Sequence, residues 1–209
     1  MITLAPPSAD RLSSLVERQR PDPFNYQPGL LGRIDGLRRW YVDRHDEVVG
    51  HGEHDFAAAC DAVRDWAMFR QTWARPAVPL APIEPGATVG YTARASGLWW
   101  SYCCRIIAVI DETDADGTRR FGFDYGTLRG HAERGEERFL VTRTPTGDVH
   151  FSLLAISRPG RWWVWMGLPL ARRAQARFRP DATAAVRDAV TALRTGSTDP
   201  GTSRRSPGA

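Results

Sequence analysis

The sequence predicts an α+β fold in which a curved antiparallel sheet wraps a long C-terminal helix. A strand-like and a helix-like segment come first, five β-rich segments with turn sequences between them fill residues 88–157, and a helical region follows. A sheet that curves around the last helix buries the apolar face of both elements. We expect residues 1–21 to be an N-terminal extension, residues 22–194 to be one domain, and residues 195–209 to be a disordered tail without an apolar anchor.

The N-terminal elements follow from the spacing of apolar residues. Leu12 and Leu15 predict a short helix, and the alternating rings of Phe24 and Tyr26 predict an extended segment after it. Residues 41–50 are rich in β-formers and predict a strand.

A helix is predicted over residues 56–70, with Asp55 as its cap. Prolines between residues 76 and 85 then mark a loop. The helix prediction rests on apolar residues at helical spacing: Phe56, Cys60, Val63 and Ala67.

Residues 88–157 predict an antiparallel meander, because short β-rich runs with short connections favour pairing between neighbours in the chain. The predicted strands are Thr88–Ala93, Trp99–Asp111, Arg119–Leu128, Glu137–Thr144 and Val149–Ser157. Turn-forming residues occupy three of the connections: Ser96-Gly97, Asp116-Gly117 and Thr146-Gly147-Asp148.

The last helical region is expected to begin after Ser157, with Pro159 in its first turn. Because proline lacks a backbone N–H, Pro169 is expected to cause a kink or a restart, and Pro180 a bend or an interruption. The apolar stripe of this region is formed by Leu170, Ala174, Phe178, Val186, Val190 and Leu193.

Composition and charge argue against several classes of protein. The net charge of +4 is accompanied by no helix-turn-helix, zinc-finger or RNA-recognition signature, so we expect no nucleic-acid partner. Cys60, Cys103 and Cys104 lie in apolar stretches, which favours reduced thiols in a cytoplasmic protein. We see no signal-peptide pattern, and the most apolar stretch, residues 161–170, is shorter than the roughly 20 residues that span a bilayer.

The run FGFDYGTLRGHAERGEERF, residues 121–139, resembles the domain-of-unknown-function family numbered nineteen-ninety, found in bacteria and plants. Its most specific part is the Gly-His-x-Glu-x-Gly-Glu-Glu core, and the resemblance covers roughly residues 22–194. The resemblance supports the fold boundaries and implies no particular chemistry. By analogy, the order of elements is similar to the helix-grip fold of START and Bet v 1-like proteins, which implies a hydrophobic cavity. Looser matches to the family are Phe24-Asn25-Tyr26, residues 50–56, residues 66–69 and Ser157-Arg158-Pro159.

Strand alternation places polar residues among apolar ones on one face of the sheet. Phe121, Phe123 and Tyr125 share a face of one strand, as do Glu137 and Phe139 on the next. If this face is interior, desolvation raises the pKa of the Glu137 carboxyl and suits it to acid–base work. Tyr125 can then donate a hydrogen bond to a substrate oxygen.

His131 lies on the hairpin between these two strands and can shuttle a proton. A purely structural interpretation stays open. In it, residues 130–135 form a simple loop, His131 binds backbone groups, and Glu136 or Glu137 pairs with an arginine such as Arg158.

Neither a metal nor a cofactor is expected. His131, Glu133 and Glu137, and the pair His51 and His54, offer nitrogen and oxygen ligands, but no His-Glu-x-x-His motif or cysteine ligand set occurs. Phosphate-binding and dinucleotide-binding glycine motifs and the G-x-S-x-G nucleophile elbow are absent from the sequence as well.

These patterns support three hypotheses of function. The leading one is a protein that binds a small hydrophobic or amphipathic molecule between sheet and C-terminal helix, with Tyr125, His131 and Glu137 orienting its polar end. The second is an enzyme on the same frame, in which those three residues are catalytic and perform cyclase- or hydratase-like proton transfer. The third is a scaffold or membrane-surface protein that uses the Trp- and Arg-rich residues 158–173, although packing is the commoner role of such rings. The expected lining residues are Phe121, Phe123, Phe139, Phe151 and Leu153.

Overall fold

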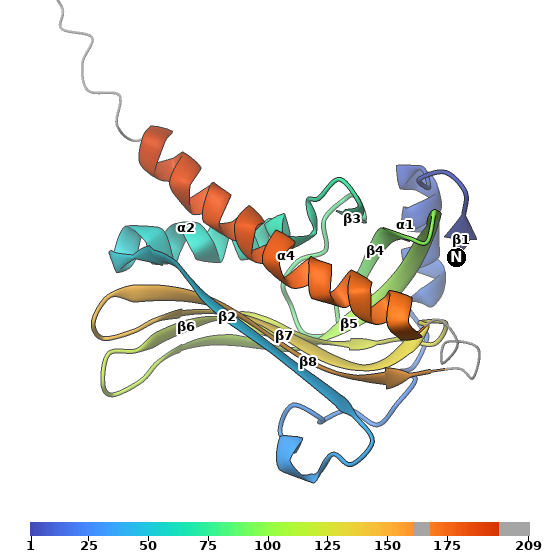
Figure 1. Ribbon diagram of the computed structural model, residues 1–209, viewed down its shortest axis with the longest axis horizontal. Helices are drawn as coiled ribbons and strands as arrows, with labels where there is room; N and C mark the ends of the chain where they lie inside the picture. The colour runs from blue at the N-terminus through green and yellow to red at the C-terminus, as the bar shows by residue number, and fades with distance from the viewer. Residues whose placement is uncertain (161–167, 197–209) are drawn as a thin grey trace, which may run out of the picture.

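The computed structural model describes residues 1–160 and 168–196, and it confirms the predicted α+β fold. One antiparallel sheet curves around a long C-terminal helix, and its strands follow the order β2-β8-β7-β6-β5-β4-β3, with β1 paired to β5 (Figure 1). The strands are β1 (Ile2–Thr3), β2 (Tyr41–His51), β3 (Ala74–Pro76), β4 (Thr88–Ala95), β5 (Leu98–Thr113), β6 (Arg119–Thr127), β7 (Glu133–Arg143) and β8 (Asp148–Pro159).

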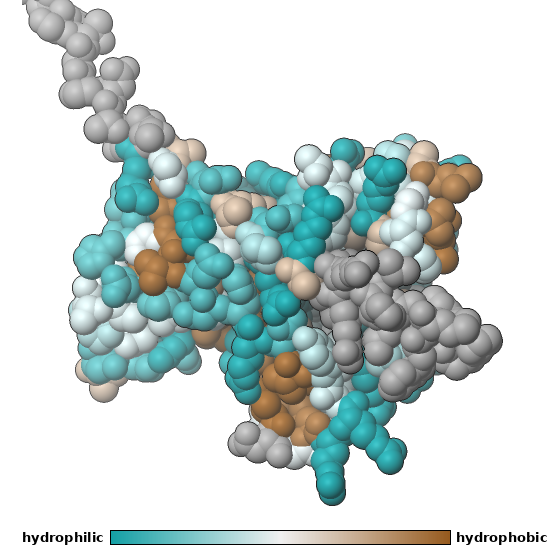
Figure 2. All heavy atoms as spheres, viewed as in Figure 1, coloured by the Kyte–Doolittle hydropathy of each residue, from teal (hydrophilic) through white to brown (hydrophobic). Residues whose placement is uncertain are grey.

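The helices lie on both sides of this sheet. Helices α2 and α4 contact each other on the concave side, while α1 packs on the outer side of β4 and β5, where Leu12 and Leu15 cluster with Cys103 (Figure 1). Hydrophilic residues cover most of the outward side of the described part of α4 (Figure 2). The helices are α1 (Ala9–Gln19), α2 (Gly52–Arg64) and α4 (Leu168–Gly196), with 3-10 turns η1 (Ile34–Gly36) and η2 (Ala67–Phe69).

The meander is confirmed because β4 to β8 pair in sequence order. Its register puts the alternating residues of β6, β7 and β8 side by side. Phe123 lies opposite Phe139, which lies opposite Leu153 on the next strand. One step along, Tyr125 lies opposite Glu137, and Ala155 continues that row. The alternation of side chains along each strand, which the sequence already indicates, therefore determines which of them share the concave face.

The helices differ from the predicted ones at several points, and α2 ends at Arg64, where the prediction extended to residue 70. Helix α2 begins at Gly52, four residues before the predicted start, so the N-cap is His51 and the prediction of Asp55 as the cap is wrong. Asp55 lies in the first turn instead, where its carboxylate accepts the His51 N–H at 2.8 Å. Pro159 is the last residue of β8, so the predicted helix start at this proline is wrong. Pro180 lies inside α4 without interrupting it.

Packing explains why α4 continues past Pro180. One missing backbone hydrogen bond is offset by burial of the following turns, in which Ala182, Val186 and Val190 are fully buried against the core.

The rings of Trp162, Trp163 and Trp165 and most of the predicted tail lie outside the described residues. No helix in the described residues is both long and apolar enough to cross a membrane.

The core occupies one half of the concave side. Phe121, Phe123, Phe139 and Phe151 pack there under α2 with Trp66, and all five side chains are buried. The Trp66 ring lies 5.0 Å from the Phe123 ring between centroids, and its Nε1–H donates to the Ala81 carbonyl oxygen at 2.8 Å. Helix α2 thus fills the half of the sheet where the large side chains are.

Candidate functional site

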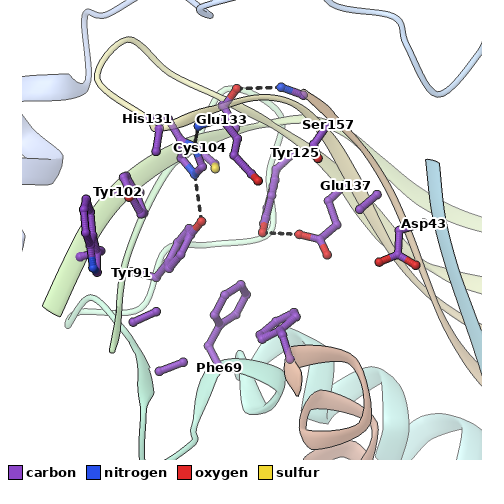
Figure 3. A pocket seen from close by; sticks show the side chains of 18 of the residues that line it. Asp43, Phe69, Tyr91, Tyr102, Cys104, Tyr125, His131, Glu133, Glu137 and Ser157 are labelled. Carbon is purple, nitrogen blue, oxygen red and sulfur yellow. Dashed lines mark hydrogen bonds between the residues drawn. The ribbon is translucent and has the colours of Figure 1, made fainter. Parts of the chain in front are cut away.

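A cavity of about 370 Å³ occupies the other half of the concave side, between the sheet, η2 and the N-terminal half of α4 (Figure 3). Small side chains on the sheet leave this space open, among them Ala93 and Ala95 on β4 and Ala155 on β8. Rings from five segments form much of the wall: Phe69 of η2, Trp73 of the connection after it, Tyr91 of β4, Trp100 and Tyr102 of β5, and Phe178 of α4.

Tyr125 and Glu137 meet in the floor of this cavity. They are direct cross-strand partners on β6 and β7, and the Tyr125 hydroxyl donates to Glu137 Oε2 at 2.7 Å (Figure 3). The second carboxylate oxygen of Glu137 makes no hydrogen bond within the part of the chain that the structure describes. Glu137 therefore offers one bound and one open oxygen to the cavity.

The surroundings of Glu137 favour its neutral form. Burial raises the pKa of Glu137 from 4.5 to about 7, because the carboxylate loses hydration there. The hydrogen bond from Tyr125 works in the opposite direction, and the negative charges of Glu133 and Asp43 add to the increase in pKa. A carboxyl with a pKa near neutrality can give or take a proton at the pH of the cell.

His131 reaches the cavity from the β6–β7 connection. Gly130 has a φ of +96°, and this left-handed residue turns the chain so that the imidazole lies against the Tyr102 ring, 4.3 Å between centroids. Its Nε2 lies 3.0 Å from the Tyr91 hydroxyl, and its Nδ1 accepts the Glu133 N–H at 3.0 Å (Figure 3). Burial lowers the pKa of His131 to about 4, so the ring is neutral at physiological pH.

An ion pair joins α4 to the rim of the cavity. Arg179 of α4 binds Asp43 of β2, a buried carboxylate that lies opposite Ala155 in the sheet. Two residues further along α4, about half a turn on, Asp181 accepts a hydrogen bond from the Trp73 Nε1–H at 2.8 Å. These two contacts hold α4 over the cavity from opposite sides.

The predicted site residues fall into two groups. Tyr125, His131 and Glu137 all lie in the cavity wall, together with Leu153, which was expected to line it. The remaining predicted lining residues do not lie along the cavity, because α2 covers them in the core. These are Phe121, Phe123, Phe139 and Phe151.

The two adjacent glutamates, Glu136 and Glu137, differ completely in their contacts. Glu136 is buried on the convex side, where its carboxylate accepts the N–H groups of Gly29 at 2.6 Å and Leu31 at 2.9 Å. It also accepts the Tyr26 hydroxyl at 3.1 Å. Within the described residues neither Glu136 nor Glu137 pairs with an arginine, since backbone amides and tyrosine hydroxyls bind these carboxylates there.

Other chemistries find little support in the described residues. No group of three or more His, Cys, Asp or Glu side chains lies close enough together there to hold a metal ion. Cys104 is fully buried in the cavity wall, and burial raises the pKa of its thiol well above the usual range, which leaves it un-ionised and weakly reactive.

Several cavity residues that the sequence analysis did not identify lie on β4 and β5. Tyr91 and Tyr102 are cross-strand partners, and Trp100 lies opposite Ala93 one step further along. The same alternation that placed Tyr125 and Glu137 on one face would have found them. The sequence carries no local signal for Arg179, because its partner lies 136 residues away on β2.

Comparison with known proteins identifies the sequence family. Residues 34–185 match the family model described as Domain of unknown function (DUF1990). A UPF0548 protein of Dictyostelium discoideum is 33% identical over 200 residues, covering 87% of this chain and 92% of that protein. A UPF0548 protein of Deinococcus radiodurans is 35% identical over 192 residues, covering 85% and 92%. The Dictyostelium relative extends the family beyond bacteria and plants.

Solved structures resemble the chain more distantly. Ara h 8.0201 is 12% identical with a TM-score of 0.44, covering 73% of this chain and 99% of that one. The di-domain ARO/CYC BexL from the BE-7585A biosynthetic pathway is 10% identical with a TM-score of 0.47, covering 77% and 53%. Likeness at this level bears on neither ligand nor chemistry.

Proposed function

The chain belongs to the DUF1990 family, and we propose that it binds a small, largely apolar molecule with a polar end in the cavity between the sheet and α4. The observation that carries this proposal is the cavity itself. Aromatic rings and small apolar side chains form most of its wall, and a few polar groups, including Tyr91, Tyr125 and Glu137, converge on it. This combination is typical of sites for small organic ligands.

The size of the cavity supports the same proposal. An engineered cavity of about 150 Å³ is large enough to bind benzene, and this one measures about 370 Å³. A molecule of two or three fused rings therefore fits. Burial of such a ligand is favourable by roughly 25 cal/mol for each Å² of apolar surface removed from water.

A pair of matched substitutions tests the proposal. Ala155→Phe places a ring inside the cavity, because Ala155 lines it. Ala108→Phe is the control: Ala108 is the cross-strand partner of Asp124, whose carboxylate binds Arg138 on the opposite side of the sheet. Native mass spectrometry of gently purified protein is expected to show an added small-molecule mass in the wild type and the control, and a much smaller fraction in Ala155→Phe.

Two outcomes would count against the proposal. One is an added mass that stays at the wild-type level in Ala155→Phe protein with a native circular dichroism spectrum. The other is an empty wild-type protein that also fails to bind added tetralin, a two-ring hydrocarbon, in an NMR titration up to the solubility limit of the hydrocarbon.

A second candidate function, acid–base catalysis on the bound molecule, is favoured by one observation. Glu137 combines a pKa of about 7 with an oxygen that is open to the cavity and a neighbouring hydroxyl that can stabilise developing negative charge. If Glu137 transfers protons, the bound compound is expected to take up deuterium at carbon when the complex is held in heavy water. Glu137→Gln should still bind the compound and should abolish the exchange, and equal exchange in both proteins would exclude this role.

A further inference from the structure

The two hydrogen bonds of His131 determine which ring nitrogen carries its hydrogen and whether the Tyr91 oxygen accepts or donates. The Glu133 N–H can only donate, so the Nδ1 that accepts it carries no hydrogen. A neutral imidazole then has its hydrogen on Nε2, and this N–H donates to the Tyr91 oxygen at 3.0 Å. Tyr91 is thus the acceptor in this pair.

That assignment leaves the hydroxyl hydrogen of Tyr91 without a partner. Tyr91 makes no other side-chain hydrogen bond within the described residues, and its half-buried ring lies in the cavity wall. Burial raises the pKa of Tyr91 well above its usual range, so the hydroxyl keeps its hydrogen. Because His131 occupies one side of the oxygen, Tyr91 presents a donor to the contents of the cavity.

The charges along the wall restrict what this donor can bind. The carboxyl groups of Asp43, Glu133 and Glu137 line the cavity. Among the described lining residues, Arg179 is the one arginine, and it is already paired with Asp43. An anionic ligand would lie near Glu137, whose one hydrogen-bond partner within the described residues is the Tyr125 hydroxyl, and the two negative charges would repel each other whenever this carboxyl is ionised.

From this arrangement, and resting on the proposed function, we infer that the ligand is an uncharged molecule whose carbonyl oxygen accepts a hydrogen bond from Tyr91, and that His131 holds the hydroxyl in the donating direction. Tyr91 is the residue that determines specificity, and His131 is a positioning residue. The Tyr102 ring packs against the imidazole of His131 at an interplanar angle of 34°. The Glu133 N–H fixes its tautomer.

Two probes that differ only in a carbonyl group test the inference: 1-tetralone and the hydrocarbon tetralin. Dissociation constants are measured by NMR titration for the wild type and for Tyr91→Phe, which keeps the ring and removes the hydroxyl. We expect Tyr91→Phe to bind 1-tetralone about fivefold more weakly than the wild type, which is the effect of losing one ordinary hydrogen bond. The affinity for tetralin should change less than about twofold, because packing is preserved.

Tyr102→Phe is the matched control, since Tyr102 lines the same cavity but its hydroxyl is not fixed by His131. It should leave both constants near the wild-type values. His131→Asn keeps an acceptor near the position of Nδ1 and loses the contact with Tyr91, so it should weaken 1-tetralone selectively. His131→Gln carries an amide near the position of Nε2 and should recover part of that loss, which a merely structural role would not produce. If the His131 variants fail to fold, the two tyrosine variants still decide the question.

The possible results separate this inference from the proposed function. Equal changes for both probes in Tyr91→Phe, or the same selective loss in Tyr102→Phe, would overturn the inference and leave apolar binding intact. If the wild type binds the anion 1,2,3,4-tetrahydro-2-naphthoate more tightly than 1-tetralone, the inference that the ligand is uncharged is overturned. Failure of the wild type to bind any of the probes would contradict the proposed function and the inference with it.

Discussion

Replacement of Glu137 by glutamine is expected to change how stability depends on pH. The pKa of Glu137 is about 7 in the native protein, against 4.5 for an ordinary glutamate. The native state therefore holds this proton more tightly than the unfolded chain does. The contribution of Glu137 to stability is fully present below about pH 4.5, and it is lost as the pH rises toward 7.

The size of this effect follows from the difference in pKa. Each pKa unit corresponds to about 1.4 kcal/mol. The charged Glu137 therefore costs about 3 kcal/mol of native stability above pH 7. This value is an upper bound, because the open oxygen of Glu137 faces a cavity that water can enter. Glutamine keeps an oxygen for the Tyr125 hydroxyl and never ionises, so Glu137→Gln should escape this cost.

Urea unfolding of both proteins at several pH values measures the effect. The free energy of unfolding of the wild type, relative to Glu137→Gln, should fall by roughly 2–3 kcal/mol between about pH 5 and pH 8. His131 has the opposite dependence, since its pKa is lowered to about 4 and its contribution is lost as the pH falls below 6.5. Both proteins contain His131, so the difference between them isolates Glu137. If the free energy of unfolding of the wild type minus that of Glu137→Gln stays constant or rises with pH, the buried environment assigned to Glu137 is refuted.

Two further substitutions test the frame of the site by urea unfolding. Glu136→Gln should lower the free energy of unfolding by about 2–3 kcal/mol, because it places an amide donor against buried N–H groups. Glu53→Gln, at an exposed position, is the control. Equal losses of stability in the two variants would contradict a structural role for Glu136. Gly122→Ala should cost about 2–3 kcal/mol, because a Cβ there would overlap the Phe139 carbonyl oxygen. Gly36→Ala is its control: open space surrounds Gly36, so the free energy of unfolding should change by less than about 0.5 kcal/mol. If Gly122→Ala were equally harmless, β6 and β7 would have to be able to move apart at this point.

The sheet and part of the site could be predicted from the sequence because successive side chains of a strand alternate between the two faces of the sheet. Alternation along β6 and β7 brings Tyr125 and Glu137 to one face, and the short hairpin between these strands makes them direct partners. The same pattern identifies the four phenylalanines as interior residues. It does not reveal that α2 covers them.

The position of the cavity could not be predicted because it depends on packing between distant segments. Helix α2 covers the half of the sheet with large side chains, and α4 spans the other half through Phe178 and Arg179. Two of the contacts that hold α4 there join residues 108 and 136 positions apart in the chain. Periodicity within one element carries no information on such pairings.

The pair Glu136 and Glu137 shows how one strand separates structural from functional chemistry. Successive residues of β7 point to opposite faces of the sheet, so two neighbouring carboxylates enter different environments. Glu136 meets backbone N–H groups on the convex side, which fix the loop around residues 29–31. Glu137 meets one tyrosine hydroxyl on the concave side and keeps an open oxygen. A shift of β7 by one residue would exchange these environments and would leave a charged group in each wrong place, which is a strong reason for the register to be unique.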